Sequence, residues 1–246
     1  EFVEKGLKNK IVKTPDLHKY AGPFKYSSQM IEEKNTVGIA TGLAWTQAGG
    51  DILFIEVAKM PGHSHLTLTG NLGDVMKESC QAALSYVRPR FKLFGLQQDF
   101  YNKMDIHVHV PEGAVPKDGP SAGAAIATAM VSSLTKIPVS KDVGMTGEIT
   151  LRGRILEVGG IKEKVIAAHR AGIKKIILPK NNKKDLDDIP KAVLSDLKFV
   201  FVEHIDQVLK EALVFPQNKF HFAMLQKEKV NGERNRKQKS IKVVKN

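Results

Sequence analysis

Ser121 lies in a stretch whose residue types suit a nucleophile, Pro116-Lys-Asp-Gly-Pro-Ser-Ala-Gly123. A serine hydroxyl attacks a carbonyl only when a base removes its proton and hydrogen-bond donors stabilise the oxyanion that forms. Gly119 and Pro120 predict a sharp turn into a helix, and the free N–H groups at a helix start attract negative charge. The same pattern is typical of a serine that only caps a helix, so both interpretations stay open here.

Lys164 is the lysine best placed to act as a base. At about 100° per residue along a helix from Ile161, Lys164 projects within the apolar stripe, whereas Lys162 falls at its edge. The stripe consists of Ile161, Val165, Ala168 and Ala171. A lysine in such a place either extends its ammonium group to solvent or stays buried and gives up its proton near neutral pH. A serine–lysine pair is one variant of the Ser-His-Asp arrangement.

Several other patterns in the sequence resemble known kinds of site. Ser133-Leu-Thr-Lys136 matches a Ser-x-x-Lys motif, but its companion motifs Ser-Asp-Asn and Lys-Thr-Gly are absent from the sequence. His107 and His109 share one strand face and could bind a metal, as could His63 and His65, but no third ligand stands at a useful spacing. No histidine is marked as a partner of the nucleophile, and no P-loop motif is present. We therefore expect neither a metal nor a cofactor in this chain.

The periodicity of apolar residues predicts a single domain of mixed α/β (α+β) class. Strands are expected at residues 37–45, 52–58, 66–69, 105–110, 173–178 and 197–202, with a hairpin formed by 143–150 and 154–158. Helices are expected at residues 74–87, 121–134, 162–171, 184–193 and 205–213. Strand–helix–strand units dominate the second half of this domain.

Charge and polarity divide the chain into three parts: a lead-in segment at 1–36, the domain at 37–214 and a tail at 215–246. The net charge is +12, and the tail alone holds nine Lys/Arg against two Asp/Glu. Such a composition predicts a solvated, disordered tail, especially at 226–239. Non-specific contact with nucleic-acid phosphates is the alternative, although the most basic part lacks aromatic residues for base stacking.

The remaining composition excludes some classes of protein. The hydrophobic fraction of 42% is enough for a sizeable core. No run of 18 apolar residues occurs, so no membrane span is predicted. Cys80, the single cysteine, lies in an apolar helical pattern and is expected in the core. The chain starts without Met and without a signal-peptide pattern, so we expect a fragment of a longer protein.

Taken together, the serine and lysine stretches resemble the proteolytic domain of Lon, the ATP-dependent protease. The stretch 116–123 is similar to that around the family's nucleophile, and Gly159-Gly-Ile-Lys-Glu-Lys164 to that around its lysine. Further similar stretches are 42–46, 68–79, 145–153 and 167–172. The resemblance runs from about residue 37 to 214, and residues 10–36 resemble the junction after the ATPase module.

The resemblance implies a Lon-type proteolytic domain in which Ser121 and Lys164 form the catalytic dyad of a serine endopeptidase. It further implies that Thr146 helps to position the lysine, that Glu56 is a supporting acidic residue, and that Asp118 can hold an inactive arrangement in some members. The segment 61–65 departs from the family pattern near the substrate groove, so substrate preference is not predicted.

The resemblance also implies a larger machine. Family members form hexameric rings whose sites face an enclosed chamber, and a preceding module that uses ATP and Mg²⁺ feeds unfolded or damaged proteins into it. We expect these cofactors outside this chain and a bacterial cytoplasm as the location, with the mitochondrial matrix as the alternative. Lon-like proteins also bind DNA, which would suit the basic tail.

Overall fold

A computed structural model describes residues 34–46 and 49–215, together with residues 13, 16, 19, 20 and 22. Most of the lead-in segment and the tail from residue 216 therefore lie outside the described residues, as does the disorder expected at 226–239. The three-part division of the chain stays a prediction. Among the described residues, no helix is long and apolar enough to cross a membrane.

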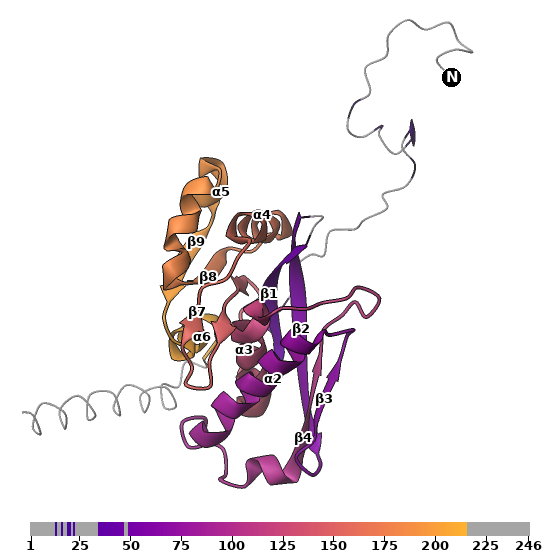
Figure 1. Ribbon diagram of the computed structural model, residues 1–246, viewed down its shortest axis with the longest axis vertical. Coiled ribbons are helices and arrows are strands. Elements are labelled where there is room, and N and C mark those ends of the chain that lie inside the picture. Colours follow the sequence, from indigo (N-terminus) through magenta and orange to yellow (C-terminus); the bar gives the residue numbers. More distant parts are fainter. Residues whose placement is uncertain are drawn as a thin grey trace, which may run out of the picture.

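A seven-stranded sheet forms the centre of the domain, in the order β3-β4-β2-β1-β5-β8-β9 (Figure 1). Its strands are β1 (Ile39–Thr46), β2 (Gly49–Pro61), β3 (Leu66–Thr69), β4 (Met104–His109), β5 (Val143–Met145), β8 (Lys175–Pro179) and β9 (Lys198–Val202). Every neighbouring pair is parallel except the two pairs that β2 forms with β1 and β4. A second, small sheet pairs β6 (Glu148–Ile149) with β7 (Ile155–Leu156).

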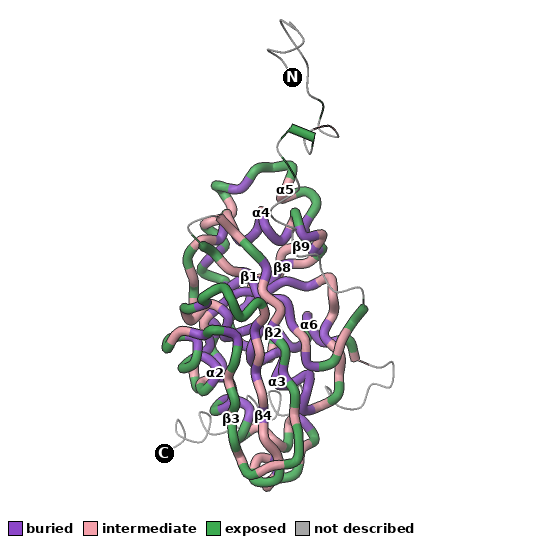
Figure 2. Tube along the Cα trace, turned by 90° about the vertical axis from the view of Figure 1, so that its right-hand side faces the viewer, coloured by how far each residue is buried: buried purple, intermediate pink, exposed green. Residues whose placement is uncertain are grey.

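Helices cover both faces of the large sheet. They are α2 (Asp74–Val87), α3 (Gly123–Thr135), α4 (Ile161–Ala171), α5 (Lys191–Asp196) and α6 (Ile205–Ala212), with 3₁₀ segments η2 (Arg88–Arg90), η3 (Phe100–Lys103), η4 (Pro120–Ala122) and η5 (Lys180–Asp188). Ala40 and Ile55 join a hydrophobic cluster with α2, α3 and α6, whereas Leu43 and Ile52 join a second cluster with α4. Alternate residues of β1 and β2 thus face opposite clusters. Buried positions lie along the middle of the molecule (Figure 2).

The predicted fold class is confirmed, and several elements match closely. The helix expected at 74–87 has those bounds, and the helix carrying Lys164 starts one residue earlier than expected. Cys80 has no exposed surface and belongs to the core cluster, and burial raises the pKa of its thiol to about 12. The cysteine is therefore a packing residue.

The hairpin expected at 143–150 and 154–158 is only partly correct. β5 joins the large sheet between β1 and β8, and only β6 and β7 pair as a hairpin. The chain leaves the large sheet at Gly147, whose φ of 153° favours glycine. A Cβ there would lie 2.6 Å from a side-chain carbon of Ile155, so the turn also needs glycine for space.

The single helix expected at 184–193 is wrong. A 3₁₀ segment, η5, occupies residues 180–188, Ile189 is extended, and α5 begins only at Lys191. Pro190 explains the break, because it has no N–H to donate and it disfavours helical geometry in the preceding residue.

Gly50 in β2 sets how closely α4 can approach the sheet. A Cβ at this position would lie 2.0 Å from the carbonyl oxygen of Glu163 and 3.0 Å from the backbone nitrogen of Lys164. The backbone of α4 therefore rests directly on β2. Lys164, whose backbone nitrogen is part of this contact, is buried in the domain.

We predict that Gly50→Ala lowers the free energy of unfolding by about 1–3 kcal/mol, because the added methyl group forces α4 away from β2. The matched control is Gly159→Ala, beside the same helix, where an added Cβ meets nothing within 4 Å. It should change stability by less than about 0.5 kcal/mol. Urea denaturation of both variants measures the difference, and equal stabilities would contradict this role of Gly50.

Candidate active site

The helix α4 holds Lys164 inside the domain. Gly160 starts the helix in the left-handed conformation (φ 70°), and Gly172 ends it in the same conformation (φ 91°). The side chains of the predicted apolar stripe are all buried: Ile161, Val165, Ala168 and Ala171. Lys164 is buried with them and is only 2% exposed. The helical phase of the sequence therefore identified the buried lysine correctly, and Lys162 is exposed.

Within the described residues, the ammonium group of Lys164 has a single hydrogen-bond partner, the hydroxyl of Thr146, with Nζ and Oγ1 3.1 Å apart. No carboxylate in the described part of the chain forms an ion pair with it. Burial lowers the pKa of Lys164 from 10.5 to about 8, because the charged form loses its hydration. Such a lysine releases its proton close to neutral pH, which is what a general base requires.

Ser121 lies in the 3₁₀ turn η4, two residues before α3 begins at Gly123. Ala122, not Ser121, is the residue that precedes the first helical position, and no side chain caps α3. The structure thus contradicts the interpretation of Ser121 as a helix cap and the expectation that the helix starts there. Gly119, with φ 114°, supplies the backbone geometry that turns the chain into η4.

Thr146 links Lys164 to the backbone of Ser121. Its Oγ1 donates a hydrogen bond to the carbonyl oxygen of Ser121 at 3.2 Å, while the same atom accepts from Lys164. The backbone N–H of Gly147 donates to that carbonyl as well, at 2.8 Å. The backbone of Ser121 is therefore held by the segment between β5 and β6, and Thr146 lies between the two residues of the predicted dyad.

Asp118 acts in this structure on α2 rather than on Lys164. Its Oδ1 accepts hydrogen bonds from the N–H groups of Met76 (2.9 Å) and Gly119 (2.8 Å). The bond from Met76, followed by that from Gly119, holds the pKa of Asp118 below its ordinary value. The carboxylate lies where a Cβ of Gly73 would be, 2.3 Å from Cγ, so α2 starts directly against it. Asp118 thereby satisfies a free N–H of the first turn.

Glu56 is exposed on β2, where it pairs in register with Ile39 of β1 and His109 of β4. Within the described residues it makes no contact with Ser121, Lys164 or Thr146 that would count as a hydrogen bond or ion pair. Thr146 therefore contacts both residues of the predicted dyad, whereas Asp118 contacts the first turn of α2. A role for Glu56 stays a prediction.

The alternative sites do not assemble. His107 and His109 both contact the hydroxyl of Thr69, at 2.8 and 2.7 Å, and the described residues contain no group of three or more side chains arranged to hold a metal. The Ser-x-x-Lys pattern has its serine, Ser133, buried in α3, and its lysine in the turn that ends the helix.

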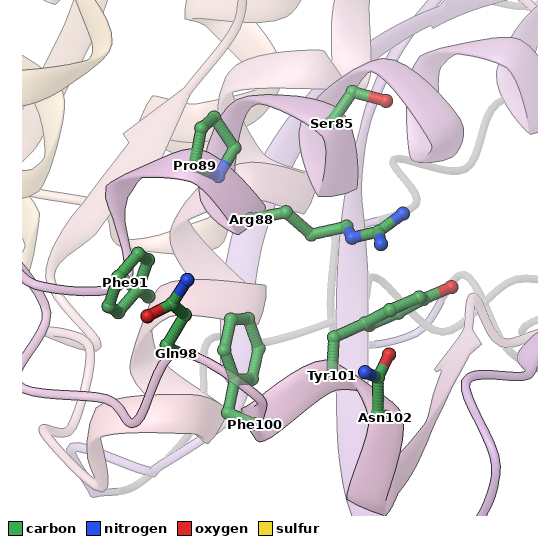
Figure 3. A pocket seen from close by; sticks show the side chains of 8 residues that line it. All are labelled: Ser85, Arg88, Pro89, Phe91, Gln98, Phe100, Tyr101 and Asn102. Atoms are coloured by element: carbon green, nitrogen blue, oxygen red, sulfur yellow. The ribbon is translucent and has the colours of Figure 1, made fainter.

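The surface has two hollows that do not include Ser121 or Lys164 in their walls. One of about 510 Å³ is formed by residues 157–163 with parts of η5. The other, of about 480 Å³, lies between the end of α2 and η3. There the guanidinium carbon of Arg88 lies 3.9 Å from the centroid of the Tyr101 ring (Figure 3). The candidate base is thus enclosed in the protein rather than placed at the wall of either hollow.

Two residues near the site were not singled out from the sequence. Gly147 anchors the Ser121 carbonyl through a backbone N–H, which no side-chain pattern reveals. Lys117 is only 7% exposed although it lies in a loop, and its Nζ donates to three backbone carbonyls. Its position beside Asp118 in the serine stretch was visible, but no periodicity exists in a loop to indicate burial.

Comparison with known proteins identifies the family. A sequence model of the family described as Lon protease (S16) C-terminal proteolytic domain matches residues 11–215. The chain belongs to this family. The resemblance seen in the serine and lysine stretches is confirmed, and the match begins within the lead-in segment.

Individual relatives are similar over most of this chain. Lon protease of Dictyoglomus thermophilum is 60% identical over 204 residues, which are 83% of this chain and 26% of that protein. Lon protease of Bacillus thuringiensis is 62% identical over 78% of the chain and 24% of its own length. Lon protease 1 of Syntrophobacter fumaroxidans is 55% identical over 90% and 28%. This chain thus spans about a quarter of the curated relatives it matches.

We predict that the burial of Lys164 makes stability depend on pH. Between about pH 8 and 10.5 the unfolded chain keeps this proton and the folded chain has lost it, so the free energy of unfolding rises with pH in that window. The difference between the two pKa values corresponds to roughly 3 kcal/mol. Lys164→Met should remove this rise, which urea denaturation at pH 7 and pH 10 measures.

Lys162→Met is the control for the loss of one positive charge on the same helix, because Lys162 is exposed. It should show the same pH dependence as the parent chain. If Lys164→Met also followed the parent curve, the folded chain would not be holding this lysine in a dehydrated place.

Proposed function

We propose that this chain is the serine endopeptidase domain of an ATP-dependent protease, with Ser121 as nucleophile and Lys164 as general base. One observation carries the proposal: a lysine that is 2% exposed has a threonine hydroxyl as its partner, and that hydroxyl is bonded to the backbone of Ser121. Membership of the Lon proteolytic-domain family supports the same assignment.

The enclosure of Lys164 makes the base effective. With a pKa of about 8, roughly one molecule in ten carries the neutral amine at pH 7, against about one in 3,000 at the ordinary value of 10.5. Thr146 donates its proton to the Ser121 carbonyl, so its oxygen accepts an N–H from Lys164. The lone pair of the amine is then left for the proton of the Ser121 hydroxyl.

Acylation follows from these positions. The neutral amine of Lys164 takes the hydroxyl proton as Oγ of Ser121 attacks the carbonyl carbon of the peptide bond, and a tetrahedral oxyanion forms. Lys164 then gives that proton to the leaving nitrogen, the C–N bond breaks, and an ester links the acyl group to Ser121. Water gives a proton to Lys164 as its oxygen attacks the ester carbon, and Lys164 then returns that proton to Oγ of Ser121 as the ester C–O bond breaks, which releases the acid and restores both residues.

The oxyanion needs donors close to Oγ. At the start of α3 the N–H of Gly123 is bonded to Pro120, and that of Ala124 to Gly147. In our proposal the donors are therefore the N–H groups of the turn itself, at Ser121 and Ala122, rather than those of the first turn of α3.

For the whole protein we propose the organisation expected of the family. Unfolded or damaged proteins are the substrates, a preceding module uses ATP and Mg²⁺, and the assembly is a homohexamer in the cytoplasm of a bacterium, or alternatively in the mitochondrial matrix. The names of the matching relatives support protein substrates, since each is called a Lon protease. This chain itself is proposed to hold no cofactor.

We predict that Ser121→Ala and Lys164→Met each abolish cleavage of a fluorogenic peptide and acylation by a β-lactone, while both variants stay folded. The adduct, located by mass spectrometry, should map to Ser121 in the parent chain. Its rate of formation should rise with pH to a plateau with a midpoint near 8, as Lys164 loses its proton.

Thr146 offers a matched pair of variants for the same assay. Thr146→Val removes the hydroxyl and should slow acylation by about 10²-fold, whereas Thr146→Ser keeps it and should stay within about threefold of the parent. Near-normal acylation of Lys164→Met would remove the lysine from the mechanism. An adduct on a residue other than Ser121 would remove the serine.

The charge of the tail supports a second proposal, non-specific DNA binding by residues 216–246. Each phosphate contact contributes about −0.9 to the slope of log affinity against log salt. Removal of these residues should therefore flatten the slope measured by fluorescence anisotropy with duplex DNA, and an unchanged slope would contradict the proposal.

Light scattering on the same two samples tests the hexamer, since a monomer at high concentration would show that this domain does not assemble by itself.

A further inference from the structure

Lys117, four residues before Ser121, is a second buried lysine with surroundings unlike those of Lys164. Its Nζ donates hydrogen bonds to the carbonyl oxygens of Gly70 (3.2 Å), Val115 (3.0 Å) and Glu112. A lysine ammonium has three N–H donors, and here each has a backbone acceptor. The neutral amine would offer only two donors and a lone pair facing three carbonyls, so this arrangement requires the charged form.

The three carbonyls belong to two segments that are far apart in the sequence. Glu112 and Val115 lie in the loop that follows β4, and Gly70 lies in the connection from β3 to α2. The backbone of Lys117 strengthens the same junction: its N–H donates to Asn71, and its carbonyl accepts from Gly73. The ammonium group thus folds the loop back on itself and fixes it to the start of α2.

The chain runs from this junction directly into the nucleophile. Asp118 bonds to the first turn of α2, Gly119 turns the chain, and Ser121 follows in η4. On its other side, Ser121 is held through its carbonyl by Gly147 and Thr146. The path of residues 118–120, between these two anchors, decides where the Ser121 hydroxyl stands relative to Lys164.

We propose that Lys117 is a positioning residue for the peptidase reaction: its ammonium group gathers the carbonyls of Gly70, Glu112 and Val115 and thereby holds the loop that sets the place of the Ser121 hydroxyl. The inference rests on the proposed role of Ser121 and adds a residue that does not touch the substrate. A displacement of about 1 Å in a reacting group costs on the order of 10² in rate, so loss of this tether should act mainly on acylation.

The test compares Lys117→Met with Lys59→Met in the full 246-residue chain. Lys59 is a matched control, because its Nζ also donates to a backbone carbonyl, that of Leu134 at 2.8 Å, but at the far end of α3 from Ser121. The rate of β-lactone acylation is measured across pH on folded protein, together with amide hydrogen exchange.

The expected result is acylation about 10²-fold slower in Lys117→Met and within about threefold of the parent in Lys59→Met. The pH midpoint near 8 should stay in both, because it belongs to Lys164. Hydrogen exchange should become faster at the N–H groups of Lys117 and Gly73, which lie in the tethered junction, and stay unchanged in α6. A merely structural role would lower stability without this local pattern.

Lys117→Gln, which keeps two N–H donors, replaces the Met variant if that protein does not fold. Acylation within threefold of the parent in either folded variant would overturn the proposal. So would a failure of both variants to fold, since Lys117 would then support the whole domain rather than this loop. If the parent chain formed no adduct at Ser121, the proposed function would fail first, and hydrogen exchange would still decide whether the tether exists.

Discussion

The dehydrated ammonium group of Lys164 is the constraint on which the rest of this domain depends. Taking a charge out of water is unfavourable, and among the described residues only the hydroxyl of Thr146 replaces a hydrogen bond that the ammonium group would make to water. The fold sustains this cost because α4 is pressed onto β2 at Gly50 and its apolar stripe completes a hydrophobic cluster. Burial in this cluster lowers the pKa of the lysine to about 8, so a larger fraction of its amine is neutral near neutral pH.

Two buried lysines show how the number of acceptors decides the role of an amine. Lys117 faces three carbonyl oxygens that need N–H donors, so the charged form is satisfied and the residue works as a tether. Lys164 faces one hydroxyl, which can accept or donate, so the amine can lose its proton without leaving a partner unpaired. Burial lowers the pKa of both groups. The neighbours of the two lysines, rather than their burial, thus distinguish the proposed general base from the proposed positioning residue.

Elements that depend on local signals follow from the sequence, whereas elements that depend on pairing between distant segments do not. The sequence predicts α2 and α4 within a residue because apolar periodicity is a local property, and because Gly172 marks the end of α4. The helix predicted across Pro190 is wrong. The polar residues at 184–193 show no interruption in pattern, but a proline inside a helix breaks it. The predicted hairpin is too long because the pattern of apolar residues shows no break between β5 and β6. Only pairing with strands distant in the sequence separates them at Gly147.

By itself, the sequence determined which serine and which lysine to consider, since the serine stretch and the phase of one helix are local properties, and it indicated the family through them. The tertiary structure decided what those residues experience. Burial of Lys164, the link through Thr146 and the anchoring of the Ser121 carbonyl all join segments that are far apart in the chain. Desolvation depends on every atom that excludes water around a group, so no stretch of sequence specifies it until the sheet and its helices have packed.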